Sequence, residues 1–354
     1  MSNITDVTVT ITRETVPVSQ EGFGLPLIVG NKTEISTISE VQEGKYYVCN
    51  SLVEVGELDS GVTNTEVYKM ASAIFMQTPS PEKVAVAWID LSTPEAAAED
   101  LASIIAAGHN DWYFLLSPTK TVEVIDALAT FAAGNEKLYF GSVPYGTLTG
   151  LTGTGLTGAT TQNERAVIIC HKKADTEYPE AAWVGKCAPY LPGSITWKFK
   201  TLSGVSVSGY DSATEGAIKN AHANLVVSQG GILHTTEGTT MTGEYIDVIR
   251  SQDFVSTRIA ENVFRLLASS PKVPYDDRGI GMVLSEVQAV MQNATGQGII
   301  AVDKDGNGMW SVSAPTRSQI PTNDIANRIL PDIGFEFTLA GAIHSVRVKG
   351  IISI

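Results

Sequence analysis

Between residues 84 and 170, short apolar segments alternate with amphipathic ones in a regular order. Uninterrupted apolar runs occupy 84–89, 112–116, 138–140 and 166–170. Helical periodicity fills 93–108 and 117–134, and a Pro stands near the start of each of these stretches. Apolar runs without polar alternation are typical of strands buried on both faces, as in parallel sheets. The order therefore predicts βαβ units around a mostly parallel sheet.

The pattern changes on either side of this region. Residues 23–30 predict an entry strand that is punctuated by Gly and Pro. Further on, helical spacing covers 213–228, 254–268 and 280–292, and short strand patterns cover 299–302, 309–313 and 333–339. The predicted fold class is therefore α/β with a mostly parallel sheet, followed by an α+β C-terminal part.

A run of Gly, Thr and Leu without charge covers residues 146–158. Its low complexity predicts a long exposed loop or hairpin. A phosphate-binding loop would need Gly-Lys-Ser/Thr at its end, and no Lys occurs from 138 to 164. We therefore expect no nucleotide cofactor here.

Both ends of the chain show the period-2 pattern of half-buried strands. The apolar side chains that share a face are Val7, Val9 and Ile11 at the N-terminus and Val346, Val348, Ile352 and Ile354 at the C-terminus. Neither segment has a local partner strand, and a bare apolar edge strand promotes association. We expect both strands to be completed by other copies of the chain, through strand addition between subunits.

Charge and composition narrow the function further. The chain is 43% hydrophobic and 18% charged, as ordinary folded proteins are, and its net charge of −14 argues against binding to nucleic acid. Residues 1–240 hold 14 Lys+Arg and 26 Asp+Glu, whereas residues 241–354 hold 10 and 12. The nearly neutral C-terminal third is therefore predicted to be an interaction layer. No segment has the pattern of a membrane span or a secretion signal.

The candidate chemical sites are few. Asp303, Asp305 and Asn307 stand at positions 1, 3 and 5 of an EF-hand-like loop, but Ala314 stands where the bidentate Glu belongs. A polar hairpin turn explains the same residues, so we expect no metal. Cys170 and His171 are neighbours on a predicted strand and point to opposite faces, which excludes a dyad between them. Three cysteines without a zinc or redox spacing indicate synthesis in a reducing cytoplasm.

The order of these parts resembles the contractile tail sheath proteins of bacteriophages, in particular a compact sheath-like family of tailed phages and prophages. The resemblance rests on the strand-like N-terminal arm, the segment Gly22–Gly30, the βαβ middle, Gly243–Arg250 before a long helix, and the ending Phe335–His344. It spans most of the chain and is strongest in the last ~110 residues, a length typical of one domain.

The resemblance implies a structural subunit and not an enzyme. It implies an N-terminal arm (1–24) whose strand is donated to a neighbour, an outer α/β domain (25–240), and an inner, tube-facing domain (241–354) that ends in the exchanged strand 343–354. Subunits would polymerise helically around a tail tube and contract by collective rigid-body rearrangement to drive the tube into the host envelope. The implied partners are other copies, the tail tube protein, and baseplate and tail terminator proteins, without nucleic acid or direct membrane insertion. The implied location is the virion tail, after synthesis in the bacterial cytoplasm.

Two alternatives remain open at the level of sequence. One is an α/β enzyme with its site at the strand ends near 90–92, 116–118 and 143–146, where parallel sheets usually bind ligands. The other is a different self-assembling tail component, such as a tube or baseplate protein, which would share strand exchange but lack a second, outer domain.

Overall fold

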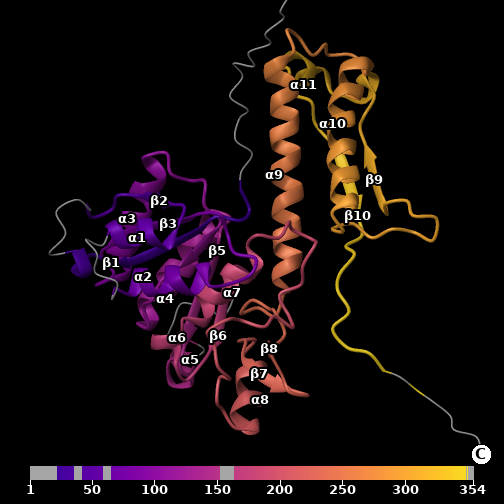
Figure 1. Ribbon diagram of the computed structural model, residues 1–354. Coiled ribbons are helices and arrows are strands. Elements are labelled where there is room, and N and C mark those ends of the chain that lie inside the picture. The colour runs from indigo at the N-terminus through magenta and orange to yellow at the C-terminus, as the bar shows by residue number, and fades with distance from the viewer. Residues whose placement is uncertain (1–21, 36–41, 59–64, 152–162, 348, 350–354) are drawn as a thin grey trace, which may run out of the picture.

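The computed structural model describes residues 22–35, 42–58, 65–151, 163–347 and 349, and it shows an α/β body from which a helical arm projects (Figure 1). The body holds a six-stranded sheet with the order β2-β3-β1-β4-β5-β6. Its strands are β1 (Pro26–Asn31), β2 (Tyr47–Cys49), β3 (Val84–Ile89), β4 (Phe114–Leu116), β5 (Leu138–Val143) and β6 (Ala166–Cys170). Every pairing is parallel except that of β2 with β3. The predicted parallel-dominated sheet is confirmed.

Helices cover both faces of the sheet. One face packs against α1 (Leu52–Leu58), α2 (Glu66–Phe75) and α7 (Pro179–Cys187), and the other against α3 (Pro94–Ala106), α4 (Val122–Gly134) and α5 (Tyr145–Leu151). Successive residues of β1 alternate between these layers, since Ile28 lies in the first core and Leu27 and Val29 in the second. This two-sided burial is why the strands read as continuous apolar runs.

Local capping fixes several of these helices. The Thr65 hydroxyl accepts from the backbone N–H of Tyr68 at the start of α2, and Thr93 caps α3 in the same way with Pro94 following it. The body is completed by η1 (Lys32–Ile35), α6 (Ala174–Glu177), α8 (Ser212–Asn220) and the antiparallel hairpin of β7 (Val226–Gln229) and β8 (Ile232–Thr235).

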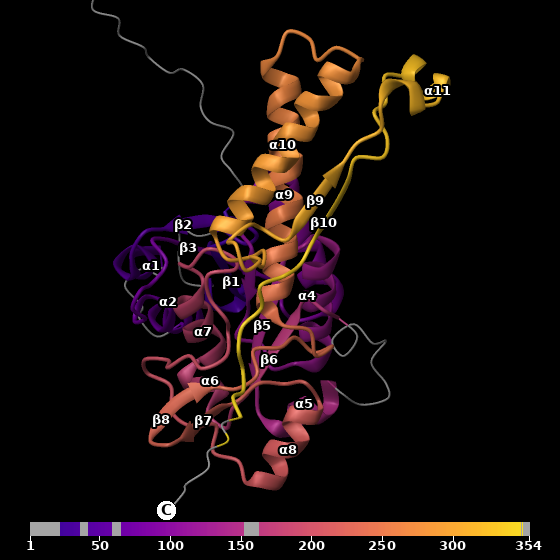
Figure 2. The ribbon, with the colours of Figure 1, turned by 90° about the vertical axis from the view of Figure 1, so that its right-hand side faces the viewer.

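The arm consists of two long helices and a two-stranded antiparallel sheet. Its elements are α9 (Ile246–Ser269), α10 (Asp277–Gly296), β9 (Trp310–Ser313), η2 (Arg317–Gln319), α11 (Thr322–Ala326) and β10 (Gly334–Phe337). At 24 residues, α9 is about 36 Å long. Figure 2 shows α9 and α10 side by side, with the chain after β10 returning from the arm toward the body. The C-terminal part is therefore α+β, as predicted.

Three predicted elements differ from the structure. Residues 146–151, predicted as the start of an exposed loop or hairpin, lie in α5 (Tyr145–Leu151), because Leu148 and Leu151 pack into the second core one turn apart. Residues 152–162 lie outside the described part of the chain. The helix predicted over 213–228 ends at Asn220. His222, two residues later, has a φ of 58° and turns the backbone out of the helical conformation before β7 begins. The strand predicted at 299–302 is reduced to isolated bridges, Ile300 with Leu339 and Val302 with Gly308.

Candidate assembly surface

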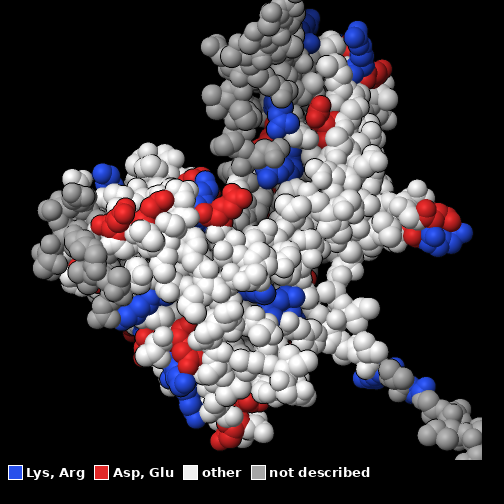
Figure 3. Space-filling view, in the orientation of Figure 1, with Lys and Arg blue, Asp and Glu red and all other residues white. Residues whose placement is uncertain are grey.

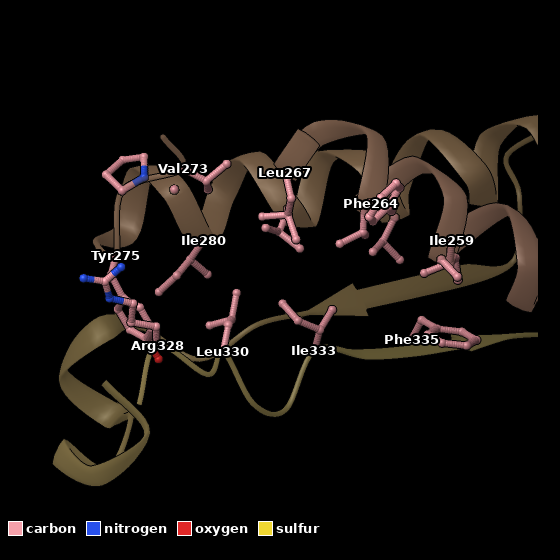
Figure 4. A pocket seen from close by; sticks show the side chains of 16 residues that line it. Ile259, Phe264, Leu267, Val273, Tyr275, Ile280, Arg328, Leu330, Ile333 and Phe335 are labelled. Atoms are coloured by element: carbon pink, nitrogen blue, oxygen red, sulfur yellow. The ribbon is translucent and has the colours of Figure 1, made fainter. Parts of the chain in front are cut away.

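The outer half of the arm carries an open apolar cleft of about 580 Å³ (Figure 4). It lies between the two long helices on one side and residues 328–335, which lead into β10, on the other. The apolar side chains that line it include Ile259, Phe264, Leu267, Ile280, Val283, Leu330, Ile333 and Phe335. Phe264 is 63% exposed and Leu267 is 54% exposed, so this stripe of α9 lacks a covering partner within the described chain. Contiguous exposed apolar surface of this kind marks interaction sites.

The sheet beside this cleft is unusually small. β9 and β10 pair only with each other in the part of the chain that the structure describes, so each strand has an edge with free backbone N–H and C=O groups. Two isolated strands are marginally stable by themselves, and free edges accept further strands. The arm therefore offers apolar surface and backbone hydrogen-bonding groups next to each other, which is what strand addition needs.

The predicted terminal strands fall largely outside the described residues: Val7, Val9, Ile11, Val348, Ile352 and Ile354 all do. Of this predicted set only Val346 is described, and its side chain is 75% exposed. Residues 343–347 pair with no strand of the described chain. The prediction that these segments link subunits stays a prediction.

The base of the arm is anchored in the body by a buried ionic cluster that the sequence did not reveal. Arg165, just before β6, donates two hydrogen bonds of 2.7 and 2.6 Å to the Asp253 carboxylate on α9. The Tyr113 hydroxyl donates to the same carboxylate at 2.5 Å. Burial, together with the charge of Asp253, raises the pKa of Tyr113 well above its ordinary value, which keeps the hydroxyl a donor.

Arg250, one turn before Asp253, strengthens the same junction. Its side chain is 1% exposed, and its guanidinium lies over the rings of Phe114 and Trp197, at 5.3 and 5.7 Å. It donates to the carbonyl oxygens of Phe23 and Tyr190. All the buried residues of α9 lie between 246 and 255, so the first half of the helix belongs to the core of the body and the second half projects from it.

The strand ends proposed for an enzyme site are occupied by local structure. Asp90 is paired with Lys32 at 2.7 Å and accepts hydrogen bonds from Ser92, and the backbone N–H of Tyr145 donates to the Tyr210 hydroxyl. Neither the arm cleft nor the two other cavities described, beside Gly193 and beside Gly22, is lined by residues of 90–92, 116–118 or 143–146.

The other candidate chemical residues also have structural roles. Asp303 Oδ1 accepts from the backbone N–H groups of Asp305 and Asn307, as in a polar turn. Among the described residues, no three His, Cys, Asp or Glu side chains gather as metal ligands. Cys170 lies in the second core, where burial raises the pKa of its thiol to about 11, while His171 contacts the Ser206 carbonyl.

Glu180, on α7, is an acid buried inside the body. It is fully buried, and neither carboxylate oxygen has a hydrogen-bond partner among the described residues. Lys120 Nζ lies 3.8 Å from Oε1 and donates to Ser142. Burial raises the pKa of Glu180 above its ordinary value, and the nearby Lys120 opposes this only in part.

We expect Glu180→Gln to raise the free energy of unfolding at pH 8 by about 1–3 kcal/mol, because the neutral amide avoids the cost of burying a carboxylate charge that Lys120, at 3.8 Å, offsets only in part. The folded-state pKa is raised, so the neutral acid stabilises the fold fully below the unfolded-state pKa, and this contribution is lost as the pH rises through the folded-state value. The increase in the free energy of unfolding that Glu180→Gln causes should therefore shrink toward pH 4. Urea denaturation at pH 4, 6 and 8 measures it, with Glu82→Gln on the surface as control. An equal gain at every pH would contradict this explanation.

The charges of the molecule give a final feature of this surface. Figure 3 shows Lys, Arg, Asp and Glu side chains in small scattered groups of both signs, with broad uncharged areas over the arm and its junction with the body. The uncharged areas are typical of protein surface that is covered in an assembly.

None of the described helices is long and apolar enough to cross a bilayer.

Comparison with known proteins finds others that share this architecture. Residues 246–352 match the family described as "E217 tail sheath protein gp31-like, C-terminal domain". A chain in the anti-feeding prophage (AFP) baseplate structure aligns with 94% of this chain and 94% of its own length, at a TM-score of 0.70 and 14% identity. A chain of the contracted AFP helical sheath covers 95% of both chains, with a TM-score of 0.65 and 13% identity. A chain of the contracted sheath complex of PVC, an extracellular contractile injection system, covers 94% of this chain and 92% of its own, with a TM-score of 0.65 and 12% identity. No curated protein sequence matches the chain.

These matches agree with the predicted structural role. The matched family is described as a tail sheath protein domain, and the matched chains come from structures described as sheaths and a baseplate. The agreement with the solved structures extends through the α/β body as well as the arm, since each alignment covers nearly the whole chain. The resemblance to contractile tail sheath proteins is thereby confirmed: over nearly its full length the chain has the fold of the aligned sheath chains, and its residues 246–352 match the gp31-like family of tail sheath C-terminal domains.

Proposed function

We propose that this chain is the structural subunit of a contractile tail sheath, which polymerises helically around a tail tube. The observation that carries the proposal is the arm, whose apolar cleft lies next to a two-stranded sheet with free edges. A head-to-tail contact that does not close into a ring generates a helical filament. The AFP relative is a helical sheath, which supports the same assembly for this chain.

The occupant of the cleft and sheet edge is a terminal strand of another copy. The apolar side chains that share a face are Val7, Val9 and Ile11 in segment 5–12 and Val346, Val348, Ile352 and Ile354 in segment 343–354. They would lie on the cleft while the backbone extends the sheet. In this arrangement, residues 1–24 form a donated N-terminal segment, residues 25–240 form the outer α/β domain, and residues 241–354, which include the helical arm, form the inner, tube-facing domain. The nearly balanced charge of 241–354 suits close packing against a tube protein.

Contraction is a collective rigid-body rearrangement of such subunits, and the donated strands keep neighbours connected while the bodies rotate. The anchoring of α9 by Arg165 and Asp253 supports this, because body and arm then move as one unit. The remaining partners are the tail tube protein and the baseplate and tail terminator proteins, and the site of action is the virion tail. There the sheath would drive the tube into the host envelope.

Negative-stain electron microscopy of the purified full-length chain, at increasing concentration and salt, tests the proposal. We expect long, hollow, striated tubes above a threshold concentration, because the subunit carries both the donating segments and the accepting surface. Size-exclusion chromatography below that threshold supplies the control, in which the same protein elutes as a single subunit. Uniform small particles at every concentration would contradict polymerisation by this chain alone.

A further inference from the structure

The chain that leaves the arm after β10 is held by its own subunit at two separate places. The first is the end of the arm sheet, where the Ala340 N–H donates to the Ile299 carbonyl at 2.8 Å and Leu339 forms a bridge with Ile300. The second is His344. It is the only residue of 340–347 whose side chain is not classed as exposed, although its neighbour Ile343 is 82% exposed.

The surroundings of His344 come from two distant parts of the body. Its Nε2 lies 2.9 Å from the Thr196 hydroxyl. Its ring meets Tyr245 edge-on at 4.9 Å between centroids and Phe199 at 6.4 Å, with interplanar angles of 82° and 84°. Edge-to-face ring contacts and a hydrogen bond together give a directional site for one imidazole.

The conformation of Phe199 supports a site that serves this contact. Its backbone has a φ of 62°, the left-handed region that non-glycine side chains rarely adopt. The side chain nevertheless remains 47% exposed and also contacts His234. A strained, half-exposed aromatic residue gains little from the core, and such outliers gather where a surface serves recognition.

Between the two attachment points the chain does not pack closely. A hollow of about 240 Å³ lies under it, lined by Thr196, Asp247, Leu339 and Gly341 among others. Gly341 has a φ of 61°, which turns the chain from the arm sheet toward the body. The segment 341–343 is therefore a strap fixed at both ends.

We infer that Thr196, Phe199 and Tyr245 form a docking site for His344, and that this anchor sets where the C-terminal segment departs from its own subunit. With His344 docked, a residue such as Ile352 lies at most about 28 Å from the anchor. If the anchor opens, the free chain starts at Ala340, and the same residue reaches about 14 Å further. This consequence rests on the proposed function, in which the segment is donated to a neighbour that shifts during contraction.

The test uses the full-length chain in dilute solution, with spin labels on Arg347→Cys and Ser212→Cys, because both positions are exposed. The native cysteines of the structure, Cys49, Cys170 and Cys187, are buried and resist labelling. The label is on the third residue after a docked His344, which gives a spread of roughly 10 Å, against roughly 15 Å for a label on the seventh residue after Ala340. Pulsed electron spin resonance measures the width and centre of this distance distribution.

We expect His344→Ala and Thr196→Val to broaden and shift the distribution, and the neighbouring Ile343→Ala to leave it unchanged. If the distance distribution had the same width and centre in the parent protein and in His344→Ala, the proposed anchor would be wrong. Electron microscopy of the same variants separates the two proposals. An ordered anchor in a chain that forms no tubes contradicts the sheath assembly alone, and tubes from a chain without the ordered distance contradict the anchor alone.

Discussion

Leu267→Asp is expected to abolish tube formation while the isolated subunit stays folded. Leu267 lines the cleft of the arm and is 54% exposed, so a carboxylate there is well hydrated in the free subunit. A strand inserted from another copy would bury that carboxylate without a partner, at a cost of about 3 kcal/mol or more. Since each 1.4 kcal/mol is a factor of ten, the concentration needed for assembly should rise at least about 100-fold.

The matched control is Ala268→Asp. The next residue of α9 carries the same new charge with a similar loss of helix propensity, but Ala268 does not line the cleft. Sedimentation of tubes over a concentration series measures assembly, and urea denaturation measures the stability of the subunit. Equal loss of assembly in both variants would point to a general charge effect, and normal assembly of Leu267→Asp would remove the cleft from the interface.

Asp253→Ala should produce the largest loss of subunit stability, about 3–5 kcal/mol. The substitution leaves the Arg165 guanidinium buried without its partner and leaves the Tyr113 hydroxyl without an acceptor. Because native proteins are stable by only about 5–15 kcal/mol, this loss is a large part of the total. Trp88, Trp112, Trp183 and Trp197 are each at most 1% exposed, so tryptophan fluorescence in urea reports the transition.

Two further variants distinguish the loss of the ion pair from a general effect of substituting residues in this part of α9. Gln252→Ala, at the exposed neighbouring residue of α9, should change the free energy of unfolding by less than about 0.5 kcal/mol. The triple variant Tyr113→Phe/Arg165→Met/Asp253→Leu should recover much of the loss, since well-packed apolar side chains often replace a buried ionic cluster well, and no hydroxyl is then left without its acceptor. No recovery in the triple variant would show that the cluster acts through packing around α9 and not through the unpaired groups.

The same cluster explains why body and arm are expected to move together. The first half of α9 is buried up to Val255, and the second half projects beyond the body. A helix fixed by one end in this way transmits a rotation of the body to the cleft at its other end. The anchor at His344 adds a second, weaker connection, which involves exposed side chains and is the more easily opened of the two.

Much of the body could be predicted from the sequence, because its signals are local. Runs such as Val84–Ile89 are apolar on both faces, and Thr93 followed by Pro94 marks a helix start without reference to the rest of the chain. The segment 146–151 was predicted as loop because its Gly and Thr residues outweigh two leucines in the local pattern. Only the second core, which takes up Leu148 and Leu151, makes this segment helical.

The candidate surface was only partly visible in advance. The apolar stripe of α9, including Ile259 and Leu267, could be recognised from helical spacing, but nothing in the spacing shows which part of the stripe stays uncovered. That depends on the path of residues 328–335, which closes one side of the cleft and leaves the other open.

The sequence by itself determined the parallel α/β body, the α+β character of the C-terminal part and the likeness to sheath proteins, because periodicity and the order of elements are properties of neighbouring residues. The tertiary structure alone decided the rest. Arg165 and Asp253 are 88 residues apart, and Thr196 and His344 are 148 residues apart. Contacts at such separations depend on how whole elements pack, and no local pattern encodes them.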